Sequence, residues 1–219
     1  MFLRSLVAIL LVTMSLQVIA DSMDVNMNNN MAQIKFGSSA SGMAEGNAEL
    51  QSGMLYNDKG NILLEAGLKV KGNKAQSSGG GEPQGDGESE EEDGGDSSVS
   101  SVPIESGMFG GGGVKGLFGS INQGAATHTV ACFGFGAEMG FALPTAVPIQ
   151  LVGELFTTLR LITFLDAERY SEYSVRIEAI VSPQAKVYIG YHNIGFGIRK
   201  SVGSVTLDNG SYIGISASF

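Results

Sequence analysis

Tryptophan is absent from this 219-residue chain, and charged residues make up only 16% of it. A soluble protein usually carries charge on about a quarter of its residues, so this composition is unusually apolar. The single cysteine, Cys132, excludes a disulfide bond within the chain. After residue 20 no apolar run approaches the length of about eighteen residues that a membrane-spanning helix needs. We therefore expect either a soluble protein or a membrane β-barrel.

Residues 1–20 have the composition of a secretory signal peptide. A basic residue precedes an apolar segment at 6–16, and Ala20 ends a small-residue site that predicts cleavage before Asp21. An uncleaved anchor helix is the alternative, but the apolar segment is short for a membrane span. No cysteine lies at the junction, which argues against a bacterial lipoprotein. We expect residues 21–219 to form one exported domain.

Residues 72–101 form an acidic low-complexity segment rich in Gly, Ser and Glu. They hold eight carboxylates, and without these the net charge of the chain would change from −9 to −1. Because such a segment has little apolar area to bury, we expect a disordered loop in solvent. Calcium binding is an alternative, since residues 86–93 offer many oxygen ligands. They lack the ligand spacing of a calcium-binding helix–loop–helix motif.

Outside this segment, apolar and polar side chains alternate with the period of two that is typical of β-strands. Ile62, Leu64 and Leu68 share one face of an extended segment, while Glu65 and Lys69 share the other. Turn residues separate the alternating stretches at 57–60, 143–148 and 182–185. The pattern predicts antiparallel strands at 31–37, 47–57, 61–71, 103–110, 114–120, 127–142, 147–157, 170–182, 185–197 and 210–219.

The second face of these strands carries Gly together with Glu, Lys, Arg and Gln. This is typical of an outer-membrane barrel, whose apolar side chains face lipid and whose lumen is polar. Closure pairs the backbone groups inside the bilayer, and Gly relieves crowding in a narrow lumen. The sequence therefore predicts an all-β, antiparallel up-and-down transmembrane β-barrel of about eight to ten strands, with ten favoured. A soluble secreted barrel or sandwich, with the same apolar faces turned inward, is the alternative.

An even number of strands places both chain ends in the periplasm. Counting back from the C-terminus then makes the turns at 143–148 and 182–185 periplasmic, and the connections at 164–170 and 197–210 extracellular. The count of ten requires two strands in the glycine-rich region 103–120. It assigns the acidic segment to the extracellular side.

The chain ends on an extended segment whose last residue is aromatic. Ile213, Ile215, Ala217 and Phe219 share its apolar face. Such an ending resembles the signature that the outer-membrane barrel assembly machinery reads, so we expect these four residues to form an assembly signal. Aromatic girdles at the two membrane surfaces are also expected. Their candidate members are Tyr56, Tyr188, Tyr191, Phe36 and Phe219.

Four segments of the mature chain carry a family resemblance: 24–37, 53–73, 166–194 and 205–219. Together they resemble the YfaZ family of outer-membrane proteins, and the moderately specific parts are DAERYSEY, VYIGY and LDNG. The resemblance implies a Gram-negative outer-membrane barrel in contact with outer-membrane lipid and lipopolysaccharide. It implies no established activity and no catalytic residue. The acidic segment and the Gly110–Gly113 run depart from the family pattern.

Four charged side chains fall on strand faces that we expect to line the lumen: Glu138, Glu154, Arg176 and Glu178. Because buried charges must be paired, we expect them to form an ion-pair network. In a small barrel filled by side chains, such a network is either a structural plug or the border of a narrow pore. The expected function is therefore structural or porin-like, without catalysis.

His192, in the motif GYHNIG, raises the alternative of an outer-membrane lipid-modifying enzyme. Lipid A deacylases use a His next to a Ser–Asn pair, and this motif lacks the Ser. The alternative requires a Ser or an acid within hydrogen-bond reach of His192. The run GGGGVKG lacks the ending of a phosphate-binding loop, and no basic, aromatic-rich patch indicates nucleic-acid binding. We expect no cofactor and no metal, and the sequence leaves the oligomeric state open.

Overall fold

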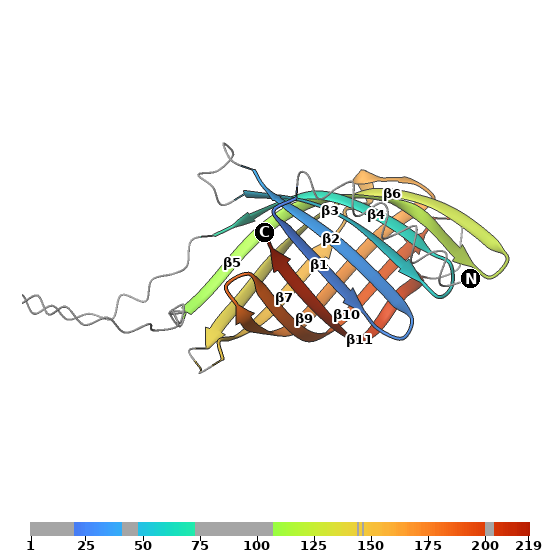
Figure 1. The fold of residues 1–219 in the computed structure, drawn as a ribbon. Helices are drawn as coiled ribbons and strands as arrows, with labels where there is room; N and C mark the ends of the chain where they lie inside the picture. The colour runs from blue at the N-terminus through green and yellow to red at the C-terminus, as the bar shows by residue number, and fades with distance from the viewer. Residues whose placement is uncertain (1–19, 41–47, 73–106, 144, 146, 200–203) are drawn as a thin grey trace, which may run out of the picture.

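Ten long β-strands form one closed sheet in the computed structural model, which describes residues 20–40, 48–72, 107–143, 145, 147–199 and 204–219 (Figure 1). The expected signal peptide, apart from Ala20, and the expected acidic loop, apart from Gly72, lie outside these residues. The long strands are β1 (Ser22–Met27), β2 (Met31–Ser39), β3 (Ala48–Asn57), β4 (Ile62–Lys71), β5 (Gly107–Gln123), β6 (Ala126–Leu143), β7 (Ile149–Thr157), β9 (Ala167–Ser182), β10 (Ala185–Ile198) and β11 (Ser204–Ser218).

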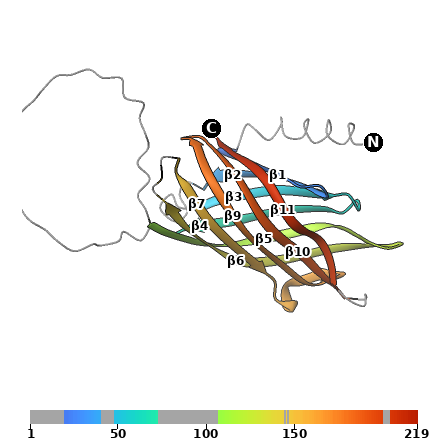
Figure 2. The same cartoon turned by 90° about the horizontal axis from the view of Figure 1, so that it is seen from below.

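The strands are ordered around the barrel as they follow one another in the chain. Each pairs with its neighbours in antiparallel fashion, and β1 pairs with β11 to close the ring (Figures 1 and 2). A short 3₁₀ turn, Arg160–Ile162, and a short strand, β8 (Thr163–Leu165), interrupt the connection between β7 and β9. Among the described residues, no helix has the length and apolar character needed to cross a membrane. The predicted all-β, up-and-down barrel with ten strands is confirmed.

The number of strands agrees with the prediction, but two errors in the predicted strands cancel. The stretches predicted as separate strands at 103–110 and 114–120 belong to one strand, β5, as far as the first is described. The glycines between them continue the pairing with β4 and β6, because a strand bonded on both sides tolerates residues of low strand propensity. The prediction missed β1, whose polar Asp24 and Asn26 hid the alternation of Met23 and Val25.

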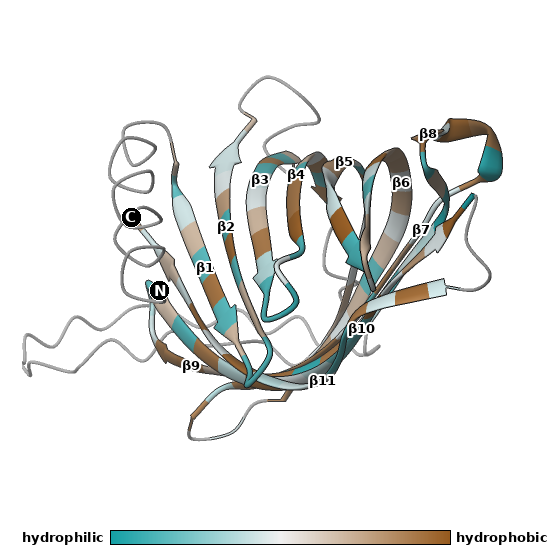
Figure 3. Ribbon diagram, turned by 90° about the vertical axis from the view of Figure 1, so that its right-hand side faces the viewer, coloured by the Kyte–Doolittle hydropathy of each residue, from teal (hydrophilic) through white to brown (hydrophobic). Residues whose placement is uncertain are grey.

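The outer surface of the barrel is apolar, and the charged side chains of the strands face the inside. On β9, Val175 and Ile177 are 52% and 51% exposed, whereas Glu178 and Ser174 are buried. The hydropathy colouring changes along the strands in the same alternating way (Figure 3). A soluble barrel buries its apolar face, so this arrangement is the reverse of what the soluble alternative requires.

The two rims of the barrel differ in the connections that they carry. The termini end holds the start of β1, the end of β11 and the connections β2–β3, β4–β5, β6–β7 and β9–β10. The loop end holds the other five connections. The predicted turns at 143–148 and 182–185 both lie at the termini end, as expected. The predicted position of the acidic segment, opposite to them, concerns residues that lie outside the described part of the chain, apart from Gly72.

The described residues on either side of the acidic segment lie at the termini end. Lys71 pairs with Gly111, and the backbone N–H of Gly72 donates to the carbonyl oxygen of Gly110 at 2.6 Å, both at the termini end. The prediction divided β5 into two strands, and this extra strand assigned every connection on its N-terminal side to the wrong rim. With β5 as one strand, the end of β4 and the start of β5 lie at the same rim as the chain ends.

The two ends of the barrel are bonded to each other. The backbone N–H of Phe219 donates to the carbonyl oxygen of Asp21 at 2.9 Å. The backbone N–H of Ser39 donates to the Asp21 carboxylate at 2.5 Å, and this hydrogen bond lowers the pKa of Asp21. The residue expected after signal cleavage is therefore fixed between β2 and the C-terminus.

Candidate functional site: the charged cavity of the lumen

Apolar side chains fill the lumen at the loop end. We call this cluster the apolar plug, and several of its members, including Ile121, Val130 and Phe196, are fully buried. The rings of Tyr170 and Phe196 pack with centroids 4.8 Å apart. The plug consists of Met31, Leu55, Leu63, Leu117, Ile121, Val130, Cys132, Phe156, Ala167, Tyr170, Ile194, Phe196, Ile198, Val205 and Leu207. At this end the barrel interior is a packed core.

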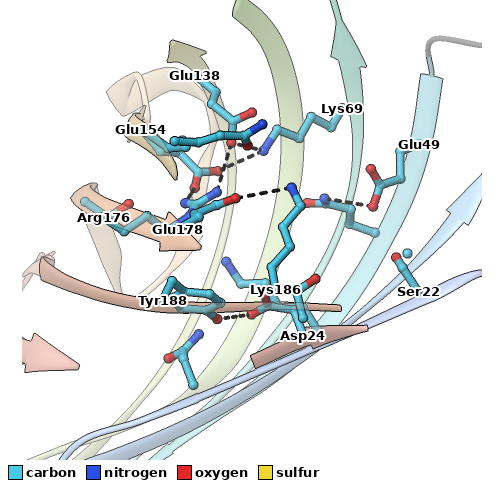
Figure 4. Close-up of a pocket in the computed structure, with 18 of the residues that line it drawn as sticks. Ser22, Asp24, Glu49, Lys69, Glu138, Glu154, Arg176, Glu178, Lys186 and Tyr188 are labelled. Carbon is cyan, nitrogen blue, oxygen red and sulfur yellow. Dashed lines mark hydrogen bonds and ion pairs between the residues drawn. The ribbon is translucent and has the colours of Figure 1, made fainter. Parts of the chain in front are cut away.

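Toward the termini end the lumen becomes charged, and Arg176 of β9 is the centre of the network there. Its Nε donates to Glu178 Oε1 at 2.6 Å, its Nη1 to Glu154 Oε2 at 3.2 Å and its Nη2 to Glu138 Oε2 at 3.3 Å (Figure 4). The four charged residues selected from the sequence thus meet in one cluster. Strand register explains the meeting, since Glu138 pairs with Glu154 across β6 and β7.

Lysines that the sequence analysis did not select extend this network. Lys69 Nζ lies 2.5 Å from Glu138 Oε2 and 3.6 Å from Glu154 Oε1. Lys186 Nζ lies 3.2 Å from Glu178 Oε2. Each buried carboxylate of the cluster therefore has a cationic partner, as charges removed from water require.

The Gly110–Gly113 run allows Lys69 to reach its partner. Lys69 lies on β4 and Glu138 on β6, with β5 between them. Gly111 and Gly113 are the β5 residues that face the lumen there, and they place no side chain in the path from Lys69 to Glu138. An added Cβ at Gly113 would also lie 2.7 Å from the carbonyl oxygen of Leu68.

A second group of ion pairs lies between this network and the apolar plug. Lys115 contacts Glu172, lies 3.5 Å from Glu65 and lies over the Phe156 ring, 4.3 Å from its centroid. The Tyr170 hydroxyl donates to Glu172, so a polar atom of the plug is bonded to the charged zone. The same alternation could have identified these residues, because Lys115, Glu65 and Glu172 lie on the polar faces of their strands.

The charged zone borders a cavity of about 350 Å³. It extends from the rim at the termini end, where Ser22 and Lys71 line it, to His192 and Tyr212 in the middle of the lumen. The Lys71 side chain is 62% exposed, so the rim is open to solvent. We call this space the charged cavity.

His192 has an acid within hydrogen-bond reach, which the enzyme alternative requires. Its Nε2 contacts Asp208, whose carboxylate also accepts a 2.7 Å hydrogen bond from Asn28 Nδ2. The Tyr212 ring stacks on the imidazole, with centroids 4.4 Å apart. Ser174 is the cross-strand neighbour of His192, but no hydrogen bond joins them among the described contacts. The pair is buried inside the lumen, away from the outer surface.

The predicted aromatic girdles are found only in part. Tyr191 lies exposed on the outer surface, and its ring centroid is 6.3 Å from that of Tyr173. Phe219 is exposed at the termini end. The prediction for Tyr188 is wrong, because strand alternation turns it into the lumen, where its hydroxyl donates to Asp24 at 2.6 Å. Phe36 is buried, which also differs from the expectation.

Comparisons with known proteins add little to this geometry. No family model and no curated protein matches the chain, so the resemblance to the YfaZ family is not confirmed. Among solved structures, the outer membrane channel DcaP of Acinetobacter baumannii is similar, with a TM-score of 0.37 and 9% sequence identity. The similarity covers 90% of this chain and 54% of that channel, so the chain spans about half of its length. The fold and site define a ten-stranded antiparallel barrel with a charged cavity and an apolar plug.

Proposed function

We propose that this chain is a small outer-membrane β-barrel whose lumen is closed at the loop end, with a structural or narrow-pore role and no catalysis. The observation that carries the proposal is the outer surface. Ile213 and Ile215 of β11, both 59% exposed, continue an apolar band that also covers β9. On β9 the band extends from Tyr173 to Val181, which matches the length of about 9–11 residues of a transmembrane strand.

Exposure of this band to water would be costly. Full burial of one large apolar side chain is worth about 1.5–3 kcal/mol, and lipid contact restores that energy. An apolar surface of this size on a soluble protein would require a covering partner. A bilayer covers all sides of the barrel at once, which agrees with the presence of exposed apolar side chains on every long strand except β2.

The orientation follows from the shared position of the chain ends. Bacterial barrels with an even number of strands place both ends in the periplasm, so we assign the termini end to the periplasm and the loop end to the exterior. Export through the signal peptide with cleavage after Ala20, and membership in the YfaZ family, belong to the same proposal. So does recognition of Ile213, Ile215, Ala217 and Phe219 by the assembly machinery.

Fractionation tests the membrane assignment. We expect the protein in the outer-membrane fraction, with a gel mobility that changes on heating, because a folded barrel migrates differently from the unfolded chain. Recovery in the soluble periplasmic fraction without heat-modifiable mobility would contradict the proposal. A Phe219→Ser variant should be inserted in lower amount, and unchanged insertion would remove the assembly role of Phe219.

Planar-bilayer recording separates the two roles of the barrel. Because packed side chains fill the lumen at the loop end, we expect the wild-type protein to show no conductance. Steps whose size depends on salt concentration would favour the narrow pore over the structural plug.

A further inference from the structure

The connection between β7 and β9 has an unusual apolar tip. Its strand β8 pairs with β6 above the end of β7, with Phe164 opposite Ala131. The Phe164 ring packs edge-on against Phe133, whose side chain belongs to the outer apolar band, with centroids 6.2 Å apart. The tip therefore continues the lipid-facing surface toward the loop end.

The tip holds its apolar side chains outward. Leu161 is 90% exposed, and Phe164 and Leu165 are about half exposed. Leu165 has a φ of 58°, a left-handed conformation that side chains such as Leu rarely adopt. The backbone N–H of Asp166 donates to Thr129 at 3.1 Å and holds this conformation in place. Figure 3 shows the apolar colouring of β8 and the turn before it. The plug already fills the lumen, so these side chains have no interior site to occupy.

Two arginines lie at the same tip, and a third lies on the strand that follows it. Thr163 joins two of them, since its carbonyl oxygen accepts from Arg199 Nη2 at 3.4 Å and its hydroxyl donates to the Arg160 carbonyl at 2.8 Å. Arg169 lies on the neighbouring strand β9, where it pairs with Gly197 of β10. Arg160 also pairs with Glu168, and its side chain is 80% exposed. Guanidinium groups and apolar side chains thus share one corner of the barrel.

We propose that this corner binds a phosphorylated lipid of the surrounding leaflet, and we call it the lipid corner. Arg160, Arg169 and Arg199 bind the phosphate, because a guanidinium can donate two parallel hydrogen bonds to it. Leu161, Phe164 and Leu165 contact the acyl chains. The inference rests on the proposed membrane location. A soluble phosphate would use the arginines but would leave the apolar side chains in water, which is why the site fits an amphiphile.

Binding to nanodiscs of phosphatidylcholine with and without lipid A tests this inference, with the refolded full-length barrel and native mass spectrometry. We expect lipid A to remain bound to the wild-type barrel and dephosphorylated lipid A to be lost. The double variant Arg169→Gln, Arg199→Gln should bind lipid A at least tenfold more weakly. The variant Leu161→Ser should weaken retention of lipid A while leaving the arginines intact.

Lys59→Gln is the matched control, because Lys59 is an exposed cation at the same end of the barrel, between β3 and β4. It should bind lipid A like the wild type. Equal binding by the arginine variant and the wild type would overturn the inference, and so would displacement of lipid A by inorganic phosphate. Failure of the barrel to enter nanodiscs would instead contradict the proposed membrane location, so the two failures are distinguishable.

Discussion

The two halves of the lumen are built on the same ten strands but are stabilised in different ways. At the loop end, side chains such as Ile194 and Phe196 are buried among other apolar groups. At the termini end, Arg176 is held by three carboxylates around a cavity. The first half depends on close packing, in which a shortened side chain leaves a cavity among neutral neighbours. The second half depends on complete pairing, so that loss of one partner leaves the others as uncompensated charges.

Removal of the central cation should have the largest effect. Arg176→Met leaves Glu138, Glu154 and Glu178 together with fewer cations, and we expect the free energy of unfolding to fall by about 3–5 kcal/mol. Urea unfolding of the barrel in vesicles measures this. The loss should shrink in acid, because protonation of the carboxylates removes their repulsion. A loss below about 1 kcal/mol would contradict the idea that the charged half depends on complete pairing.

A cavity in the apolar plug should cost somewhat less on average. Ile194→Ala removes methyl groups from a fully buried site, and we expect a loss of about 2–5 kcal/mol in the same assay. This loss should be the same at neutral and acidic pH, since no charge is involved. If the Ile194 variant instead regained stability in acid, the two halves would not be stabilised by separate mechanisms.

The Gly110–Gly113 run belongs to the charged half, because it leaves room for Lys69 of β4 to reach Glu138 of β6. Gly113→Val places a side chain between Lys69 and Glu138, and we expect a loss of about 1–3 kcal/mol from overpacking. Gly112→Val is the matched control on the lipid-facing side, where an added Cβ has only ordinary contacts. It should change the stability by no more than about 0.5 kcal/mol. Equal effects of the two variants would contradict a special role for the lumen-facing glycines.

The smallest effect is expected at the rim. Lys71 pairs with Glu49 at 2.9 Å, but its side chain is 62% exposed. Lys71→Met should lower the free energy of unfolding by about 0–1 kcal/mol, and added salt should reduce the difference further. A loss as large as that of the Arg176 variant would mean that burial does not set the strength of these pairs.

Much of the fold could be predicted because alternation depends only on local sequence. The polar face that contains Glu138 and Arg176 was visible without knowledge of any pairing. Where one strand ends and the next begins depends on pairing with adjacent strands, which the local sequence does not reveal. The glycines within β5 resembled a break, and β1 has too few apolar residues to be distinguished from a loop.

The candidate site could be predicted only up to the face on which each residue lies. Lys69 lies on the polar face of β4, yet its contact with Glu138 crosses an intervening strand and follows from the register of two pairings. The sequence of β10 already shows the change from a polar to an apolar lumen, since His192 is followed on the same face by Ile194, Phe196 and Ile198. That the other strands change at the same level can be recognised only when their register around the barrel is known.

The contact between Lys69 and Glu138 also has a consequence for strand alignment. Backbone hydrogen bonds join only adjacent strands and would form equally well after a shift along the strand. A shift of β4 by one residue would turn Lys69 from the lumen to the lipid. A charge in that position is expensive, so the ion pair that crosses β5 makes the misaligned barrel unfavourable. Two absent side chains, at Gly111 and Gly113, therefore help to decide which of the possible alignments the barrel adopts.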